Sequence, residues 1–325
     1  MKKNKHLILA MSLLAGVSLS ANAEATEGSD FKVVQVVTTD GRICCYDRSK
    51  VKEITFNTND SGTKQAKIIS TSGGTLKTYT RSEISSIDFV THHNYVAQKV
   101  VNGYTFVNMC IHPSKDKNAF FATVNLGATS DKEAGNYYSW GETAPKDATY
   151  TYHWDTYVPN GSNTSYNATS CKTWDAEHLT EDGVLKEDVD AAAVAVKGAR
   201  IPTVDEWMML KNNCTWKDVS ENPGSDARTW ADITSGDIVN GYQVTSTYCT
   251  GQTFYICAAG YHNLNTSNLT NRGGIGDYWT SQINYNSEDY AYNMGISKSW
   301  HTVGSGGYYR AGGMPIRAVL IVDQK

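Results

Sequence analysis

Hydrophobic residues in the middle of the chain follow a helical spacing that begins at a well-marked point. Val204, Trp207 and Met208 occupy positions i, i+3 and i+4, the spacing of one buried helix face. Thr203 is a favourable N-cap, and Glu206 three residues later completes a capping box. We therefore expect a helix that starts after Thr203 and is anchored in the core by Trp207.

The segments around this helix predict a mainly antiparallel β region. From about Gly103 onward, short aromatic runs alternate with turns rich in Gly, Asn and Ser. A further helix is expected to begin near Asp188 or Asp190 and to end at Gly198, a residue suited to the C′ position. Strand-like runs follow at 253–259, 277–282, 290–296 and 315–322. Two helices within such a region predict an α+β fold.

Segment 33–90 contains an internal repeat with a constant offset. The matched pairs are Gly41/Gly74, Tyr46/Tyr79, Arg48/Arg81, Ser49/Ser82 and Phe56/Phe89. Each copy predicts a strand, a tight turn, a second strand and a third strand of the form Ile-x-Phe. We expect the two copies to bury their Ile and Phe faces against one another, because neither copy has a core of its own. The pattern resembles a small β module of exported Bacteroidetes proteins, which implies spacing or docking.

The start of the chain has the three parts of a secretory signal. Lys2, Lys3 and Lys5 precede an apolar run, and a small-x-small site ends at Ala23. We therefore predict a signal peptide (1–23) and a secreted or cell-surface protein, with the periplasm as an alternative location. No later stretch approaches the roughly 20 apolar residues of a membrane helix. The predicted organisation is a linker (24–32), a repeat module (33–90), a linker (91–102) and a main domain (103–325).

The amino-acid composition and the net charge argue against one class of partner, nucleic acid. Aromatic residues make up 11% of the chain and 27 residues are Gly, which suits a globular β-rich protein with many turns. The formal net charge of −4 becomes more negative once the Lys-rich leader is removed. We predict that nucleic acid is not a partner, because binding to nucleic acid requires a basic face.

Seven cysteines give no clear disulfide framework, since the number is odd and the spacing irregular. Cys44 and Cys45 are adjacent in a strand and point to opposite faces, which disfavours a bond between them. Cys249 and Cys257 flank a turn-like segment, so they either close a hairpin or are free buried thiols. We interpret the other three as core residues: Cys110, Cys171 and Cys214.

Motifs for metal, cofactor or nucleophilic chemistry are weak or missing. His92-His93 suits either half a metal site or a solvated linker, and the second alternative is favoured. The acidic run from Glu181 to Asp190 lacks the spacing of a calcium loop and suits a helix start. The glycines of 304–313 follow no strand-to-helix pattern, which argues against a phosphate loop. We predict no metal, no cofactor and no catalytic residue.

An ordered set of motifs resembles a known family. They are Phe106-Val107-Asn108-Met109, 121–128, Gly135–Thr143, Asp190-Ala191-Ala192, Arg200–Trp207, Ala258–Tyr261, Asp277–Ser281 and Ile316–Val319. In this order they resemble the Fibrobacter succinogenes major paralogous domain, a family of exported bacterial surface proteins. The resemblance implies a C-type-lectin-like fold related to formylglycine-generating enzymes. Phe121 and Val124 depart from the family pattern, and the second departure removes a possible disulfide partner of Cys214.

Arg200, Glu206 and Arg317 form the main charged group if the fold brings them together. A catalytic role would require a carboxylate with a raised pKa in a cleft. The alternative is a buried ion pair that ties the helix to the last strand, with Trp207 packed against it. We favour the structural alternative because Glu206 already caps the helix with Thr203.

Aromatic residues in the late connections are the candidate ligand-binding residues. They are Tyr285, Tyr290, Trp300, Tyr308 and Tyr309, and a further cluster comprises Tyr150, Tyr152, Trp154 and Tyr157. Tyr and Trp offer a large contact area with a polar tip, as binding surfaces require. We predict a non-enzymatic binding or adhesion protein that recognises a glycan or a surface protein through aromatic loops. The alternatives are a structural component of a surface assembly and a degenerate enzyme.

Overall fold

The computed structural model of the protein leaves the predicted signal peptide, His93 and Cys249 outside the residues that it describes. Those residues are 31–39, 43–92, 96–114, 117–147, 149–222, 224, 226, 229–247, 252–304 and 306–323. Within them, no helix is both long enough and apolar enough to cross a membrane.

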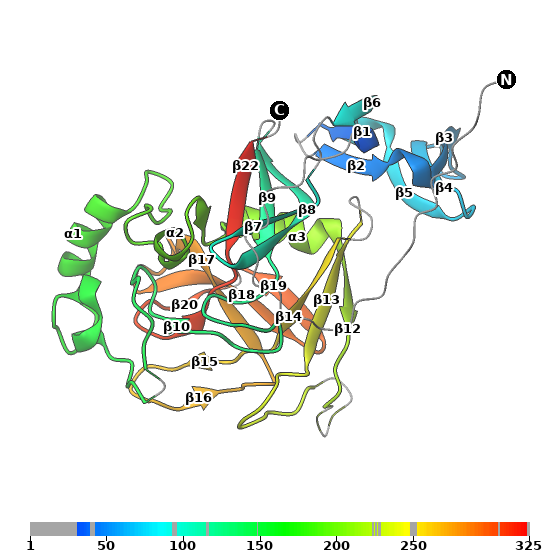
Figure 1. Cartoon of the computed structure of the whole chain (residues 1–325). Helices are drawn as coiled ribbons and strands as arrows, with labels where there is room; N and C mark the ends of the chain where they lie inside the picture. The colour runs from blue at the N-terminus through cyan, green and yellow to red at the C-terminus, as the bar shows by residue number, and fades with distance from the viewer. Residues whose placement is uncertain are drawn as a thin grey trace.

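The two sequence repeats fold as two three-stranded antiparallel sheets (Figure 1). The first copy comprises β1 (Phe31–Thr38), β2 (Ile43–Asp47), the 3-10 helix η1 (Arg48–Lys50) and β3 (Val51–Thr58). The second comprises β4 (Lys64–Ser70), β5 (Thr75–Thr80), η2 (Arg81–Glu83) and β6 (Ile84–His92). The strand orders are β2-β1-β6 and β3-β4-β5. The third strand of each copy therefore pairs with the first strand of the other copy.

Matched residues of the repeat make matched contacts. The hydroxyls of Tyr46 and Tyr79 form a buried hydrogen bond of 2.5 Å. Arg48 Nη1 donates to the Val51 carbonyl at 2.9 Å, and the bond from Arg81 Nη1 to the carbonyl of residue 84 measures 3.0 Å. The two copies therefore use the same side chains both to meet at the centre and to hold their third strands.

The predicted burial of the repeat phenylalanines is wrong. Phe56 is 69% exposed and Phe89 is 68% exposed. Each lies on an outer strand of its sheet, and Phe56 ends a row in which Ala66 and Tyr79 are buried. Phe89 likewise ends a row in which Val34 and Tyr46 are buried, so the outer end of each row is exposed.

The rest of the chain contains five further sheets and three α-helices among the described residues. The five-stranded sheet has the order β11-β22-β9-β8-β7, and the module contacts it through β2 and β8 (Figure 1). Its strands are β7 (Gln98–Val101), β8 (Tyr104–Ser114), β9 (Lys117–Ala122), β11 (Ala199–Arg200) and β22 (Val319–Asp323). The helices are α1 (Ala168–His178), α2 (Ala191–Ala195) and α3 (Val204–Asn213), with the 3-10 turns η3 (Trp154–Thr156) and η4 (Val158–Asn160).

The remaining strands pair in short antiparallel sheets. These sheets have the orders β10-β21, β12-β13-β14, β15-β16 and β17-β18-β19, with β20 on β18. Their strands are β10 (Tyr137–Tyr138), β12 (Cys214–Asp218), β13 (Gly241–Ser246), β14 (Thr253–Cys257), β15 (Tyr261–His262), β16 (Leu269–Thr270), β17 (Gly276–Ile283), β18 (Tyr290–Ser297), β19 (Trp300–Val303), β20 (Tyr308–Tyr309) and β21 (Met314–Pro315).

The α+β, C-type-lectin-like prediction is wrong, because the described residues form a mostly-β fold of many small antiparallel sheets. The helix predicted before Gly198 is only α2, five residues long, and the segment predicted as a strand at 315–322 is divided between β21 and β22. The two predicted helices are a small part of the fold, because most of the chain after the repeat module forms paired strands.

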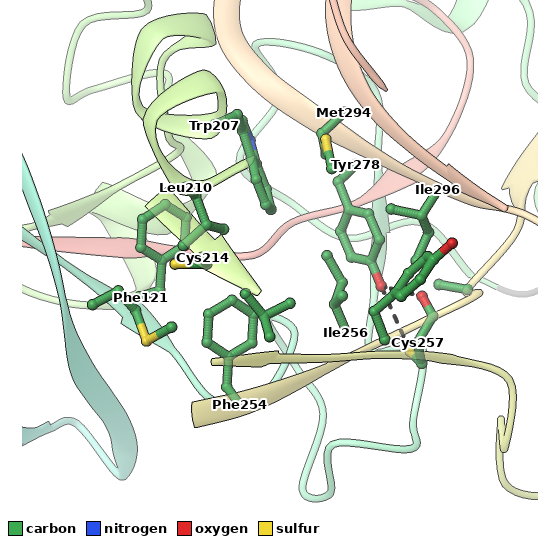
Figure 2. Packing of buried hydrophobic residues seen from close by; sticks show 14 of the residues in the cluster. Phe121, Trp207, Leu210, Cys214, Phe254, Ile256, Cys257, Tyr278, Met294 and Ile296 are labelled. Atoms are coloured by element: carbon green, nitrogen blue, oxygen red, sulfur yellow. Dashed lines mark hydrogen bonds between the residues drawn. The ribbon is translucent and has the colours of Figure 1, made fainter. Parts of the chain in front are cut away.

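The helix predicted after Thr203 is present as α3, and Trp207 is fully buried. Its ring meets Phe121 edge-on with centroids 5.5 Å apart, and Tyr278 lies 6.2 Å away on the other side (Figure 2). Phe121 also stacks on Phe254 at 6.0 Å. Trp207 thus contacts two different sheets, and Phe121 connects a third sheet to the same apolar core.

The described cysteines are buried, and one of them forms a disulfide that was not predicted. Cys257 is a free buried thiol, the second of its two alternatives, so it does not close a hairpin with Cys249. Cys110 is a core residue, as predicted, in the same apolar cluster as Val34 and Ile68 of the module, and it is disulfide-bonded. Cys171 and Cys214 are free and buried, as predicted.

Candidate ligand-binding site

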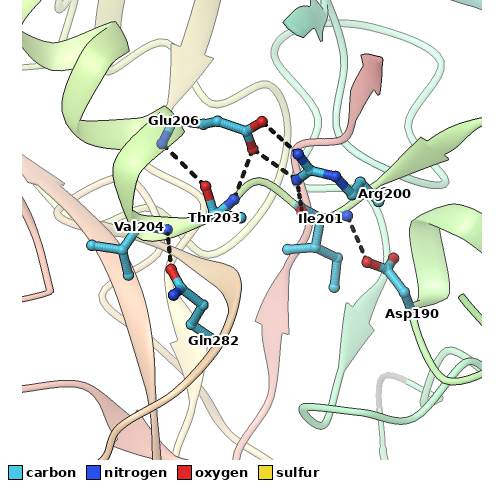
Figure 3. Close-up of polar contacts among 7 residues, drawn as sticks. All are labelled: Asp190, Arg200, Ile201, Thr203, Val204, Glu206 and Gln282. Atoms are coloured by element: carbon cyan, nitrogen blue, oxygen red, sulfur yellow. Dashed lines mark hydrogen bonds and ion pairs between the residues drawn. The ribbon is translucent and has the colours of Figure 1, made fainter. Parts of the chain in front are cut away.

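The charged group at the start of α3 is a closed ion pair (Figure 3). Arg200 Nη1 and Nη2 donate to the two carboxylate oxygens of Glu206 at 2.7 and 2.5 Å. Glu206 Oε2 also accepts from the Thr203 N–H at 2.9 Å, and Thr203 Oγ1 accepts from the Glu206 N–H at 3.2 Å. Glu206 is 1% exposed and both of its oxygens are occupied, so this group holds the helix rather than a substrate.

Arg317 binds other partners than Glu206. Its Nε donates to Asn125 Oδ1 at 2.9 Å, its Nη1 donates to the Ala122 carbonyl at 3.1 Å, and its guanidinium lies 5.4 Å from the centre of the Phe254 ring. The side chain is fully buried. The expected link from the α3 helix through Glu206 to Arg317 is therefore wrong, although both charged groups are structural.

Asp190 holds the backbone next to Arg200 through hydrogen bonds. Its Oδ2 accepts from the Ile201 N–H at 2.8 Å, and its Oδ1 caps α2 by accepting from the N–H groups of Ala192 and Ala193. Burial raises the pKa of Asp190 to about 6, and these hydrogen bonds oppose the rise. All of its acceptors serve the backbone, so Asp190 positions the chain.

Most of the candidate aromatic residues lie at strand positions. Tyr290 begins β18, in agreement with the strand predicted at 290–296, whereas Trp300 begins β19 and Tyr308 with Tyr309 forms β20, where a loop was predicted. Tyr285 lies in the connection before β18 and is 60% exposed, while Trp300 is 40% exposed. Strand pairing therefore fixes four of the five rings relative to one another.

Tyr290 and Tyr309 pack mainly against the protein itself. Their ring centres are 4.5 Å apart, and Trp154 meets Tyr309 edge-on at 6.2 Å. Tyr285 lines a cavity of about 240 Å³ together with Glu181 and Glu288. Among the described residues, neither Tyr285 nor Trp300 makes a ring contact with the Tyr290–Tyr309 pair.

Asp277 is a site residue that the sequence interpretation missed. It lies on β17 directly opposite Gly295 of β18. Its Oδ1 accepts from Asn293 Nδ2 at 2.7 Å, and among the described residues the carboxylate has no other hydrogen bond. Burial raises the pKa of Asp277 to about 7, while the bond from Asn293 opposes that rise. A strand that presents one carboxylate among aromatic residues was the only sequence signal.

Gly295 lies in close contact with this carboxylate and with the Trp300 ring. A Cβ built on Gly295 would lie 2.9 Å from Trp300 Cζ3 and 3.0 Å from Asp277 Oδ1. The first contact is closer than real Cβ atoms show and the second is unusually tight, so a side chain here would push on both groups. The absence of a side chain at this position allows the ring and the carboxylate to approach the same point.

The negative charge of Asp277 raises the pKa values of two tyrosines, Tyr261 and Tyr308. Burial raises the pKa of Tyr261, and the negative charge of Asp277 raises it further. Burial, then Tyr261 and then Asp277 raise the pKa of Tyr308 in the same way. The two tyrosine rings meet edge-on at 5.1 Å. We define the Asp277 site as Tyr261, Asp277, Asn293, Gly295, Trp300 and Tyr308.

The site contains no evident metal-binding set. No group of three or more His, Cys, Asp or Glu residues among the described residues is arranged to hold a metal ion. The chain matches no protein-family model, no characterised protein and no solved structure.

Proposed function

We propose that the protein is an exported, non-enzymatic binding protein that recognises a glycan at the Asp277 site. The observation that carries this proposal is the neighbourhood of Gly295, where the Trp300 ring and an Asp277 oxygen lie beside one another. A sugar ring offers an apolar face and hydroxyl donors side by side. An aromatic ring beside a carboxylate supplies the complementary surface, with contact area from the ring and orientation from the oxygen.

The arrangement suits binding better than hydrolysis. Glycosidases use two carboxyl groups on either side of the bond that they cleave. The influences on the pKa of Asp277 are its burial and Asn293, with no second carboxylate among them. The other buried carboxylates that we described, Asp190 and Glu206, are occupied by caps and by an ion pair. A lone carboxylate can orient a ligand without cleaving it.

Export is part of the same proposal. The Lys-rich start, the apolar run and the Ala23 cleavage site support secretion or display at the cell surface. The family resemblance supports the same location, and it remains a prediction. The repeat module would then serve as a spacer or docking element between the surface and the glycan-binding region.

Glycan-array binding with the mature protein tests the proposal, with Trp300→Ala as the decisive variant. We expect specific binding that falls at least about tenfold in Trp300→Ala, since an aromatic anchor contributes about 1–2 kcal/mol or more. Tyr285→Ala is the matched control, because Tyr285 is an exposed ring outside the site. Unchanged circular dichroism in both variants would show that the fold is intact.

Two outcomes would refute the proposal. The first is the absence of binding by the mature protein across the array. The second is binding that Trp300→Ala leaves unchanged, which would place the glycan elsewhere on the protein.

A further inference from the structure

The third strands of both repeats, β3 and β6, have an open edge. Among the described residues, β3 pairs only with β4, and β6 pairs only with β1. The two strands occupy equivalent places in the two copies, and each carries the Ile-x-Phe motif. An open edge presents unpaired backbone N–H and carbonyl groups, which can pair with a strand of another chain. Each edge is therefore a candidate surface for the addition of a strand.

Both edges carry apolar side chains that continue the inner face of the sheet. Ile54 and Phe56 of β3 are two residues apart, so they lie on the same face of the strand. Ile54 packs against the core of the module, whereas the Phe56 ring is exposed. Ile87 and Phe89 of β6 repeat this arrangement. The apolar face of each sheet thus reaches its open edge and ends there uncovered.

The two edges differ in the charges that lie on them. The residue between Ile and Phe is Thr55 in β3 and Asp88 in β6. The guanidinium of Arg48 lies over the Phe89 ring, 5.5 Å from its centre, whereas no cation lies over Phe56 among the described residues. Charges on an edge strand prevent pairing with other chains. The β6 edge therefore carries a protection that the centre of the β3 edge lacks.

The sequence of β3 is complementary to itself in the antiparallel direction. When two copies pair with Thr55 opposite Thr55, Ile54 of each copy faces Phe56 of the other. Glu53 of each copy then faces Asn57 of the other, so no like charges lie opposite one another over residues 53–57. The same alignment on β6 would instead place two carboxylates opposite one another at its centre, which is destabilising.

We propose that β3 is a dimerisation edge, to which a second copy of this chain adds its own β3 in the antiparallel direction about Thr55. The two three-stranded sheets would join across a two-fold axis, with the same surface used by both copies. Ile54 and Phe56 of one copy would cover Phe56 and Ile54 of the other. A short edge of this kind suits a weak, transient interface. The inference concerns the repeat module alone, so it does not depend on the glycan proposal.

Sedimentation velocity of the mature protein, over about a hundredfold range of concentration, measures this association. Phe56→Gln removes the apolar ring from the β3 edge, and Phe89→Gln is the matched control on β6. Thr55→Asp and Thr55→Lys each place two like charges opposite one another at the centre of the interface. Phe56 and Phe89 are exposed and Thr55 is half-buried, so we expect the variants to fold, which circular dichroism verifies.

We expect the wild-type protein to shift from monomer to dimer as its concentration rises. Phe56→Gln should raise the dissociation constant at least about tenfold, whereas Phe89→Gln should leave it unchanged. Thr55→Asp and Thr55→Lys should each remain monomeric. An equimolar mixture of these two variants should form a dimer, because opposite charges then face one another at the centre. That recovery would also show that both variants are folded.

Three results would overturn the inference. The first is a wild-type protein that stays monomeric over the whole concentration range. The second is an equal loss of association in Phe56→Gln and Phe89→Gln, which would place β6 in the interface as well. The third is a mixture of the two Thr55 variants that associates no better than either variant alone, since Thr55 would then not lie opposite its counterpart.

Discussion

Asp277→Asn should stabilise the protein near neutral pH. The folded protein holds this carboxylate in a buried position with a single neutral donor, Asn293, whereas the unfolded chain exposes it to water. The ionised form is therefore less favourable in the folded state. Asparagine has the same shape, and the Asn293 amide can reverse to accept from it, so the substitution removes the charge without removing the hydrogen bond.

The magnitude follows from the pKa of Asp277. Its value of about 7 in the folded protein compares with about 3.9 for an unperturbed aspartate, a difference of about three units. At about 1.4 kcal/mol for each unit, ionisation costs the folded state up to about 4 kcal/mol at pH 8. The side chain keeps some contact with solvent, so we expect Asp277→Asn to raise the free energy of unfolding by about 2–4 kcal/mol.

The effect should depend on pH in one direction. Because the pKa of Asp277 is higher in the folded state, the folded protein binds more protons than the unfolded chain between about pH 4 and 7, and its stability falls as the pH rises through that range. The gain from the substitution should therefore be near zero at pH 4, grow through pH 5–7 and level off above pH 7. Asp190 follows the same trend in both proteins and cancels in the difference.

Urea unfolding at pH 4, 5, 6, 7 and 8 measures this difference. Asp237→Asn is the matched control, because Asp237 is exposed and loses the same charge without relief of burial. Tyr261 and Tyr308 do not titrate in this range, since both have pKa values raised above that of an ordinary tyrosine. A destabilised Asp277→Asn at pH 8, or a gain that is the same at pH 4 and pH 8, would refute the reasoning.

Three further experiments test other parts of the structure. Glu206→Gln should lower the free energy of unfolding in urea by about 2–4 kcal/mol, because it leaves Arg200 without its counter-ion. The control Asp205→Asn, in the same helical turn, should lower it by less than about 1 kcal/mol. Equal losses in the two variants would contradict the ion-pair argument. Tyr46→Phe and Tyr79→Phe should each cost about 1 kcal/mol and be non-additive in the double variant, because they share one hydrogen bond. Additive losses would show that the bond does not link the repeats. Gly295→Ala should displace the Trp300 ring and weaken glycan binding at least about tenfold on the array, and unchanged affinity would place the ligand away from Trp300 and Asp277.

Side-chain contacts could be predicted from the sequence where a short segment contains all of the interacting groups. The capping box of Thr203 and Glu206 lies within four residues, so its side-chain bonds depend little on the rest of the chain. The repeat offset likewise predicted that Tyr46 and Tyr79 are equivalent, and the structure joins them. Helix α1 was missed because its sequence carries almost no apolar periodicity, and its start relies on the Asn167 cap.

The fold class could not be predicted from such local signals. Helical signals are strong and local, whereas pairing among short strands depends on partners far apart in the sequence. Two clear helix starts therefore suggested an α+β domain, and the many small sheets became visible only in three dimensions. The exposure of Phe56 and Phe89 has a similar cause, because an apolar alternation predicts a face but not whether a second sheet covers the end of that face.

The sequence by itself determined the start of α3, the equivalence of the two repeats, and a set of aromatic residues from which Trp300 and Tyr308 of the proposed glycan site come. Tertiary structure decided which of those rings share a site, and it added Asp277, Gly295 and Asn293 to them. The physical reason is register: a glycine and a carboxylate 18 residues apart meet only because β17 and β18 pair with Asp277 opposite Gly295.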